Sequence, residues 1–317
     1  DQFAMIWKEA NKRFDEYGND KVIGTNGFYA MKAHWSEHPD RDEAWADTER
    51  SRIGEERFRR EHECEFLIFD ETLISSLTLA DMEGVPPVET TGQVRWFKRP
   101  TPGMTYLVSL DPSMGTGGDY AAIQIFELPT FEQIGEWHHN MTPMNKQVQI
   151  LQGINKHIHD TIIERDSSAS PQIFYSMENN TIGEAALMRV MDIGEENIMG
   201  MFLSEPIRKG HRRKFRRGFN TTAKHKIDAC TKFKELVEGG KMKINSQLLI
   251  SEMKDFVATG LSYKAKPGQH DDLVSSCLLM TRMMKVLADF DPKIFEKWTD
   301  RTSELTTPMP IFGNFYG

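Results

Sequence analysis

The stretch Tyr106-Leu-Val-Ser-Leu-Asp111-Pro-Ser-Met-Gly-Thr-Gly-Gly-Asp119-Tyr-Ala-Ala-Ile-Gln-Ile-Phe126 is the most informative part of the sequence. Its apolar start predicts a short strand that ends at the carboxylate of Asp111. The glycine-containing loop that follows carries a second carboxylate, Asp119, and leads into another apolar strand. Carboxylate oxygens are the hard ligands that Mg²⁺ and Mn²⁺ prefer. The pattern therefore favours a divalent-cation site at a strand end, and the alternative is an ordinary hairpin loop with solvated acids.

Length and composition restrict the class of protein. A chain of 317 residues can form one large or two modest domains, and its 39% hydrophobic and 10% aromatic content excludes a disordered protein. No apolar run approaches the roughly 20 residues that a membrane span needs. The first residues, Asp1-Gln-Phe-Ala-Met-Ile-Trp-Lys, are no signal peptide and lack an initiating Met. We therefore expect a piece of a longer protein.

The cysteines give a prediction of the redox compartment. Cys64, Cys230 and Cys277 are too widely spaced to form a metal-ligand pair or a disulfide framework, and they lie in segments that we expect to be helix or core. This usage predicts a reducing cytoplasm.

The charge distribution is uneven. The net charge is −8, yet residues 208–217 form a strongly basic run. Its cationic members are Arg208, Lys209, Arg212, Arg213, Lys214, Arg216 and Arg217. Phosphate contacts from such side chains provide most of the sequence-independent affinity for nucleic acid. We expect the run to bind DNA, and the alternative is a solvated loop.

Three parts are expected along the chain. Residues 1–90 are predicted to be helix-rich, with a helix at 51–66, a loop at 34–45 and a Pro/Gly/Thr-rich connector at 83–92. Residues 91–290 are predicted to form an α/β domain with a mixed central sheet flanked by helices, and residues 291–317 a C-terminal tail. The strands expected in the α/β domain are 106–110, 121–127, 133–139 and 172–177. The helices expected there are 145–163, 183–190, 224–239, 248–257 and 271–288.

Two further acidic positions extend the candidate site. Glu178 terminates an apolar strand, where an ionised carboxylate is costly unless it is paired or binds metal. Asp271 and Asp272 begin a strongly apolar helix. The alternative for these two aspartates is favourable charge at a helix N-terminus, which stabilises by about 0.3–1 kcal/mol. Together with Asp111, they form a set that is less easily attributed to chance.

Several other residues are weaker candidates. Lys224 and Lys226 lie at an expected helix start, where they could contact the DNA backbone, and the alternative is an ordinary solvated helix end. His138, His139 and His270 could be metal ligands or acid–base groups, although most such histidines are strand or surface residues.

The pieces of the candidate site resemble one protein family in their order and spacing. They are Leu110-Asp111-Pro with Asp119, Met177-Glu178-Asn-Asn, Gly218-Phe-Asn-Thr-Thr-Ala-Lys-His-Lys226, Gly240-Lys-Met-Lys-Ile-Asn245, Leu249-Ile-Ser-Glu-Met-Lys-Asp-Phe256 and His270-Asp-Asp-Leu-Val274. This set resembles the nuclease domain of the large terminase subunit of tailed double-stranded-DNA phages, particularly the contractile-tailed type. Residues 34–43 and 58–66 look like the end of the ATPase motor that precedes this domain. The chain contains no Gly-x-x-x-x-Gly-Lys-Ser/Thr loop, so we expect no ATP hydrolysis by it alone.

The resemblance implies an RNase H-like fold and a metal-dependent endonuclease that cuts concatemeric viral DNA during genome packaging. It implies two Mg²⁺ or Mn²⁺ ions, with Asp111 bridging both, Glu178 and Asp271 or Asp272 each holding one, and Asp119 acting through water. The implied partners are double-stranded DNA, the ATPase motor half, the portal and the small terminase subunit, with no membrane. The implied location is the host cytoplasm, transiently at the procapsid. The alternatives are a non-catalytic DNA- or portal-binding module and another RNase H-like nuclease such as a resolvase.

Overall fold

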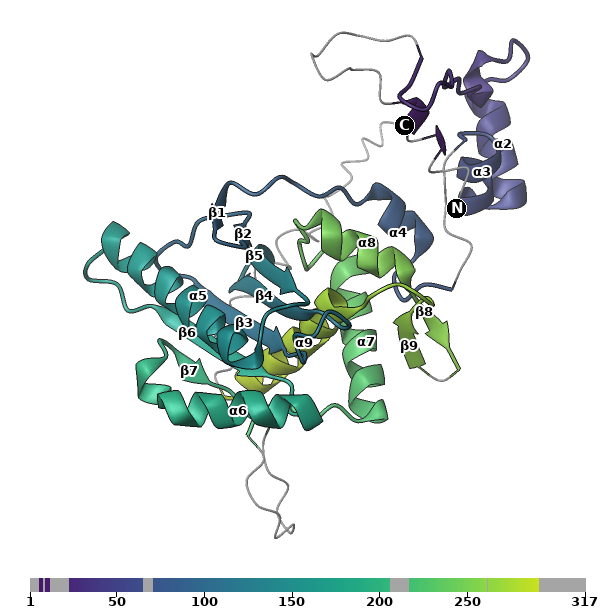
Figure 1. Cartoon of the computed structure of the whole chain (residues 1–317). Coiled ribbons are helices and arrows are strands. Elements are labelled where there is room, and N and C mark those ends of the chain that lie inside the picture. Colours follow the sequence, from purple (N-terminus) through teal and green to yellow (C-terminus); the bar gives the residue numbers. More distant parts are fainter. Residues whose placement is uncertain are drawn as a thin grey trace, which may run out of the picture. The chain divides into compact units, whose positions relative to one another are not determined.

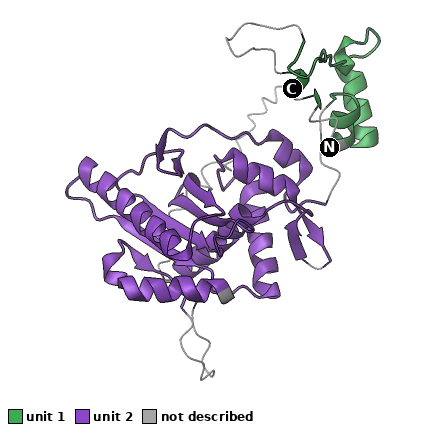
Figure 2. Ribbon diagram, in the orientation of Figure 1, with its two compact units in different colours: residues 1–69 green, residues 70–317 purple. Residues whose placement is uncertain are grey.

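The computed structural model describes residues 6, 7, 9–11, 23–64, 71–205, 217–260 and 262–290. The chain divides into two compact units, residues 1–69 and residues 70–317 (Figure 2). The helix α4 (Ser76–Asp81), which lies in the part predicted to belong to the N-terminal segment, is in the second unit. The expected C-terminal tail, 291–317, lies outside the described residues, so the three predicted domain assignments remain predictions.

The first unit is a small helical cluster. Its elements are η1 (Trp35–Glu37), α2 (Glu43–Ile53) and α3 (Glu55–Glu61). The predicted continuous helix at 51–66 is wrong, because Gly54 adopts a φ of 85° and separates α2 from α3. The predicted loop at 34–45 ends earlier than expected, since the side chain of Asp42 caps α2 by accepting from the backbone N–H of Trp45 at 2.8 Å. Trp35, Ala46 and Phe58 are its buried core.

The second unit contains a central sheet with helices on both sides (Figure 1). Among its described residues the sheet has seven strands in the order β1-β2-β5-β4-β3-β6-β7. The strands are β1 (Glu89–Thr91), β2 (Val94–Trp96), β3 (Thr105–Asp111), β4 (Ala121–Leu128), β5 (Glu132–His139), β6 (Gln172–Met177) and β7 (Met201–Phe202). The helices are α4 (Ser76–Asp81), α5 (Met144–Arg165), α6 (Thr181–Ile193), η2 (Glu195–Asn197), α7 (Ala223–Glu238), α8 (Gln247–Asp255) and α9 (Asp272–Phe290). A separate hairpin consists of β8 (Phe256–Thr259) and β9 (Ser262–Ala265).

The sheet is mixed, as the sequence predicts. Strand β3 pairs with β4 in antiparallel orientation and with β6 in parallel orientation, and β4 pairs with β5 antiparallel. The antiparallel strands follow one another directly, whereas the parallel return to β6 uses the long helix α5 as its crossover. The four strands predicted for this region are confirmed, with bounds that differ by no more than one residue at either end.

One face of the sheet is apolar. Because successive side chains of a strand point to opposite faces, Tyr106, Val108 and Leu110 share one face of β3. They belong to a single buried cluster with side chains of α5 and α6. The members contributed by these helices are Val148, Leu151, Ile154, Ile158, Ile162, Ala186, Leu187 and Val190. This packing fixes which residues of β3 can face the other side.

The opposite face carries α9 and includes several buried polar side chains. Ser109 of β3 donates to the backbone oxygen of Ser276 of α9 at 2.9 Å, and the two hydroxyl groups are 2.8 Å apart. Gln124 and Glu136, on β4 and β5, are also fully buried. By the same alternation, Asp111 lies on this face, two residues beyond Ser109.

The segment between α8 and α9 differs from the prediction. The expected helix at 248–257 ends at Asp255, and the chain continues directly into β8 and the hairpin. Lys266 closes the hairpin through two contacts with Asp255. Its backbone N–H donates to the backbone oxygen of Asp255 at 3.0 Å, and its Nζ donates to the side-chain Oδ1 of Asp255 at 3.1 Å. This hairpin returns the chain to the start of α9. None of the described helices is long and apolar enough to cross a membrane.

Candidate active site

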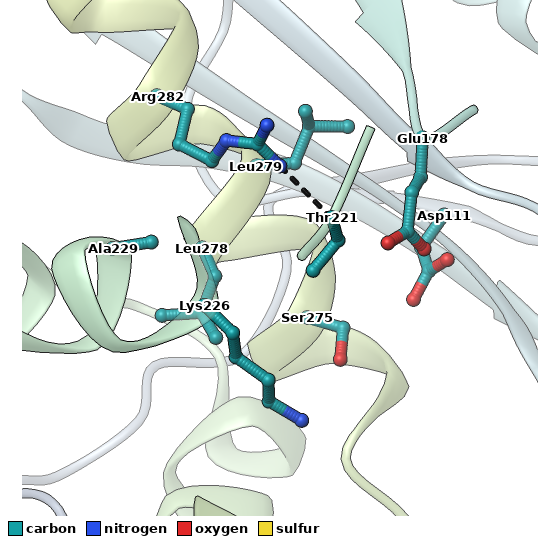
Figure 3. Close-up of a pocket in the computed structure, with 9 residues that line it drawn as sticks. All are labelled: Asp111, Glu178, Thr221, Lys226, Ala229, Ser275, Leu278, Leu279 and Arg282. Atoms are coloured by element: carbon teal, nitrogen blue, oxygen red, sulfur yellow. Dashed lines mark hydrogen bonds between the residues drawn. The ribbon is translucent and has the colours of Figure 1, made fainter. Parts of the chain in front are cut away.

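The pairing of β3 with β6 places two carboxyl groups side by side. Leu110 pairs with Met177 at the end of the parallel ladder, and the backbone N–H of Glu178 donates to the oxygen of Leu110 at 3.1 Å. Asp111 follows Leu110 and Glu178 follows Met177, and both acids are half-buried. Figure 3 shows their carboxyl groups next to each other at one side of a pocket. The structure thus brings these two predicted site residues together.

Close packing behind Glu178 holds it in place. The amide of Asn180 donates to Oε2 of Glu178 at 2.9 Å, while its oxygen caps α6. Gly183, in the first turn of α6, lies against the backbone of Glu178 so closely that a Cβ there would overlap the carbonyl oxygen. A glycine is therefore required for this approach.

The glycine-containing loop after Asp111 is tied to the start of α5. The buried side chain of Gln147 accepts from the backbone N–H of Ser113 at 3.2 Å and donates to its oxygen at 2.9 Å. Gly115, with a φ of 68°, packs directly on the backbone of Thr142. Asp119 is exposed at the far end of this loop and does not line the pocket. Its predicted role in metal binding remains a prediction.

The two aspartates before and in α9 point in different directions. Asp271 accepts from the backbone N–H of Ala265 at 3.3 Å and lies 3.9 Å from Nζ of Lys226. Asp272 accepts from the backbone N–H of Tyr120 at 3.3 Å and lies 3.7 Å from Nδ1 of His270. Asp272 is thus linked to the loop that follows Asp111, and Asp271 to a cation of the pocket.

The acids interact electrostatically. The pKa of Asp111 is raised well above its ordinary value, because burial disfavours the charged form and because the charges of Glu178, Asp272 and Asp271 repel it. Burial likewise raises the pKa of Asp272 to about 6, with a further contribution from Asp271. A bound cation would relieve this repulsion. Within the described residues, however, no three His, Cys, Asp or Glu side chains converge as a ready-made metal site.

A pocket of about 170 Å³ opens beside Asp111 and Glu178 (Figure 3). Its other lining residues are Thr221, Lys226, Ala229, Ser275, Leu278, Leu279 and Arg282. Lys226 on α7 faces the acids across the pocket, whereas Lys224 is exposed outside it. Arg282 donates to the hydroxyl of Thr221 at 2.9 Å and pairs with Glu205. The pocket therefore combines acids on one wall with a cation on the other.

Residues 108–283 match the model of a protein family described as the terminase RNaseH-like domain. The match covers more than half of the chain. The chain belongs to this terminase family. The predicted resemblance and the predicted RNase H-like fold are confirmed, whereas the contractile-tailed type remains a prediction.

Several solved structures are similar to this terminase domain. The large terminase nuclease from thermophilic phage G20c is 17% identical with a TM-score of 0.49, and the match covers 66% of this chain and 96% of that one. The nuclease domain of the Thermus phage P74-26 large terminase is 17% identical with a TM-score of 0.46, covering 64% and 90%. The human cytomegalovirus terminase nuclease domain is 13% identical with a TM-score of 0.42, covering 66% and 93%. The family assignment rests on residues 108–283 alone.

Of the predicted DNA-binding run, residues 208–217, the structure describes only the last residue, Arg217. Arg208, Lys209, Arg212, Arg213, Lys214 and Arg216 lie outside the described residues. Arg217 forms an ion pair with Glu195 of η2. The role of the run therefore remains a prediction from its charge.

Sequence reasoning missed a buried glutamate beside the acids. One oxygen of Glu252, on α8, accepts from the backbone N–H groups of Leu273 and Val274, and the other lies 3.6 Å from Nε2 of His138. Burial raises the pKa of Glu252 to about 9, so its carboxyl group is neutral at pH 7. The sequence signal was weak, because a single acid between the apolar positions of α8 is common on helix surfaces.

The neighbouring histidine is buried against an aromatic side chain. The ring of His138 stacks on Tyr120 with centroids 4.1 Å apart, and Tyr120 also contacts His270 edge-on at 4.9 Å. Burial lowers the pKa of His138 to about 4, so the ring is neutral at pH 7. His138 is thus packed between Tyr120 and Glu252, and His139 contacts the hydroxyl of Thr142 at 2.7 Å instead.

We predict that Asp272 destabilises the metal-free protein increasingly as the pH rises from about 4 to 6. The folded state keeps a proton on Asp272 up to about pH 6, whereas the unfolded chain releases it near 3.8. Between these values the folded state binds more protons, so the free energy of unfolding falls with pH, by on the order of 3 kcal/mol from this group. Asp272→Asn should remove this part of the slope. Urea unfolding in EDTA across this range tests it, and parallel curves for both proteins would contradict it.

Proposed function

We propose that this terminase domain is a metal-dependent endonuclease that cuts concatemeric viral double-stranded DNA during genome packaging. The observation that carries the proposal is the pair formed by Asp111 and Glu178 at the wall of the pocket. An aspartate whose ionisation is disfavoured by burial and by a neighbouring glutamate is unfavourable in a purely structural role. They are favourable where a cation and a phosphodiester are bound.

The residues present fit a divalent cation. All the acids of the site offer oxygen, the ligand type preferred by Mg²⁺ and Mn²⁺. We propose that Asp111 bridges two ions, that Glu178 holds one, and that Asp271 or Asp272 holds the other after its side chain rotates towards the pair. Asp272 is favoured, because its charge affects Asp111 more strongly than that of Asp271. Asp119 would act through a water molecule.

Structures of a related phage nuclease support the use of divalent metal. The large terminase nuclease from phage G20c has been solved with bound magnesium and with bound cobalt. Two such ions activate a water molecule and stabilise the leaving oxygen of a phosphodiester. Our proposal of two Mg²⁺ or Mn²⁺ ions for this chain follows the same chemistry.

The remaining pocket residues would bind and orient the substrate. Lys226 faces the acids from α7 and can place its ammonium group against a phosphate oxygen. Arg282 is engaged by Glu205 and Thr221, so it fixes the pocket wall. We propose that the basic run and Lys224 extend the contact along the DNA backbone.

The wider biological context follows from membership of the terminase family. We propose that the domain works with the ATPase motor half of the same protein. Residues 1–90 would contain the C-terminal end of that motor. We further propose contacts with the portal and the small terminase subunit, in the host cytoplasm and transiently at the procapsid.

A non-catalytic packaging module is the second candidate. In that case the acids would hold structure while the basic run grips DNA or the portal. A plasmid assay distinguishes the two functions. Only the enzyme nicks supercoiled plasmid in Mg²⁺, and addition of EDTA stops this nicking. A gel shift without cleavage would favour the module.

We predict that Asp111→Ala, Glu178→Ala and the double change Asp271→Ala/Asp272→Ala each reduce plasmid cleavage at least about 100-fold. Substitution of residues that only hydrogen-bond to metal ligands already lowers metal affinity or activity about 10–100-fold. The melting temperature in EDTA should stay unchanged or rise, because each change removes a repelling charge. Asp160→Asn, which changes a partly exposed acid of α5, is the control and should cleave normally. Full activity in one of the variants would remove that residue from the site.

A second prediction concerns the basic run. Changing Arg212, Arg213, Arg216 and Arg217 to Ala should weaken DNA binding and flatten its dependence on salt, since the slope of log affinity against log salt is about −0.9 per phosphate neutralised. Fluorescence anisotropy with duplex DNA at several salt concentrations measures both. Lys156→Ala, which removes an exposed cation of α5, should leave the slope unchanged. An unaltered slope in the quadruple variant would show that the run does not follow the phosphate backbone.

A further inference from the structure

The first turn of α9 is capped in an unusual way. Asp271 occupies the N-cap position, and its backbone oxygen accepts from the N–H of Ser275 at 2.7 Å. An aspartate at this position normally accepts from the second or third N–H of its own helix. Here these groups belong to Leu273 and Val274, and both donate instead to Oε2 of Glu252, at 2.8 and 3.1 Å.

The carboxylates of the Asp271–Asp272 pair are consequently available for other contacts. Asp271 turns to the backbone N–H of Ala265 and to Lys226, which lines the pocket. Asp272 turns to the backbone N–H of Tyr120. Neither carboxylate is used by the N–H groups that the start of α9 would otherwise present to it.

Glu252 is itself held by the helix that carries it. The hydroxyl of Ser246 caps α8 by accepting from the N–H groups of Leu248 and Leu249, and it donates to Oε1 of the buried Glu136 at 2.6 Å. This bond joins the start of α8 to strand β5. The side chain of Glu252 is only 10% exposed and lies against His138 of the same strand. The residue that caps α9 therefore belongs to a helix, α8, that is itself hydrogen-bonded to the sheet.

We propose that Glu252 is a positioning residue: it caps α9 from α8 and thereby keeps the Asp271–Asp272 pair free to face the metal site. Removal of Glu252 leaves two N–H groups without an acceptor, which is unfavourable in a partly buried place. The nearest replacement is the carboxylate of Asp271, which rotates onto its own helix. The availability of this pair for metal rests on the proposed function, whereas the exchange of caps does not.

A double-mutant cycle in EDTA tests the exchange of caps. With Glu252 present, Asp271→Ala should leave the melting temperature unchanged or raise it. In the Glu252→Ala background, where Asp271 has become the cap, the same change should lower it by about 2–4 °C. Additive effects of the two substitutions would overturn the proposal, because they would mean that Asp271 does not replace Glu252.

Calorimetric titration with Mn²⁺ tests the consequence for the site. Affinity should fall about 10–100-fold in Glu252→Ala. It should stay near that of the unaltered protein in Glu252→Gln, whose amide oxygen can accept both N–H groups. Glu235→Ala, the same substitution at an exposed acid of α7, is the control and should bind normally.

Two results would contradict this part. Unchanged Mn²⁺ affinity in Glu252→Ala would show that the pair needs no such support. If that variant does not fold, a loss of affinity in folded Glu252→Gln would equally overturn the proposal, since the cap is retained there. Absence of Mn²⁺ binding in the unaltered protein would instead refute the proposed function, and the thermal cycle would still decide the exchange of caps.

Discussion

The parallel pairing of β3 with β6 is the constraint on which the rest of the site depends. It matches Leu110 with Met177 and so brings the next residues, Asp111 and Glu178, to the same edge of the sheet. A shift of one residue in this register would turn every side chain of β6 to the other face. The apolar cluster with α5 and α6 prevents such a shift, because it accepts only one set of side chains from these strands.

The two faces of the sheet differ in the polar side chains that they bury. The apolar face supplies burial of hydrophobic surface, the main favourable term in folding. The face that carries α9 has buried groups that cost stability unless they are paired, such as Gln124 and Glu136. It also holds the repelling acids around Asp111. Unfavourable features of this kind are expected at functional sites and are balanced by packing elsewhere.

The parts of this structure that local pattern determines could be predicted from the sequence. The apolar runs that end in Asp111 and Glu178 gave both the strands and the acids at their ends, and the helix that starts at Asp272 followed from its long apolar repeat. The break at Gly54 and the strand after Asp255 were missed. In both cases a single residue or a distant contact, rather than the period of the sequence, decides the conformation.

Other features depend on contacts between distant segments. Glu252 acts on residues about 20 positions later, and no local pattern relates α8 to the start of α9. Short strands such as β1, β2 and β7 are formed by pairing with their neighbours and have little signal of their own. Cys64 was expected in helix or core and is exposed, whereas Cys230 and Cys277 are buried as expected.

The metal site is tested most directly by the position of manganese in crystals of this protein soaked with Mn²⁺, located by anomalous scattering. We expect a peak within ligand distance of the carboxyl groups of both Asp111 and Glu178, and its loss in crystals of Asp111→Asn. Peaks only at other places, or a peak at this position that survives the substitution, would contradict the claim that the register of β3 and β6 builds the metal site.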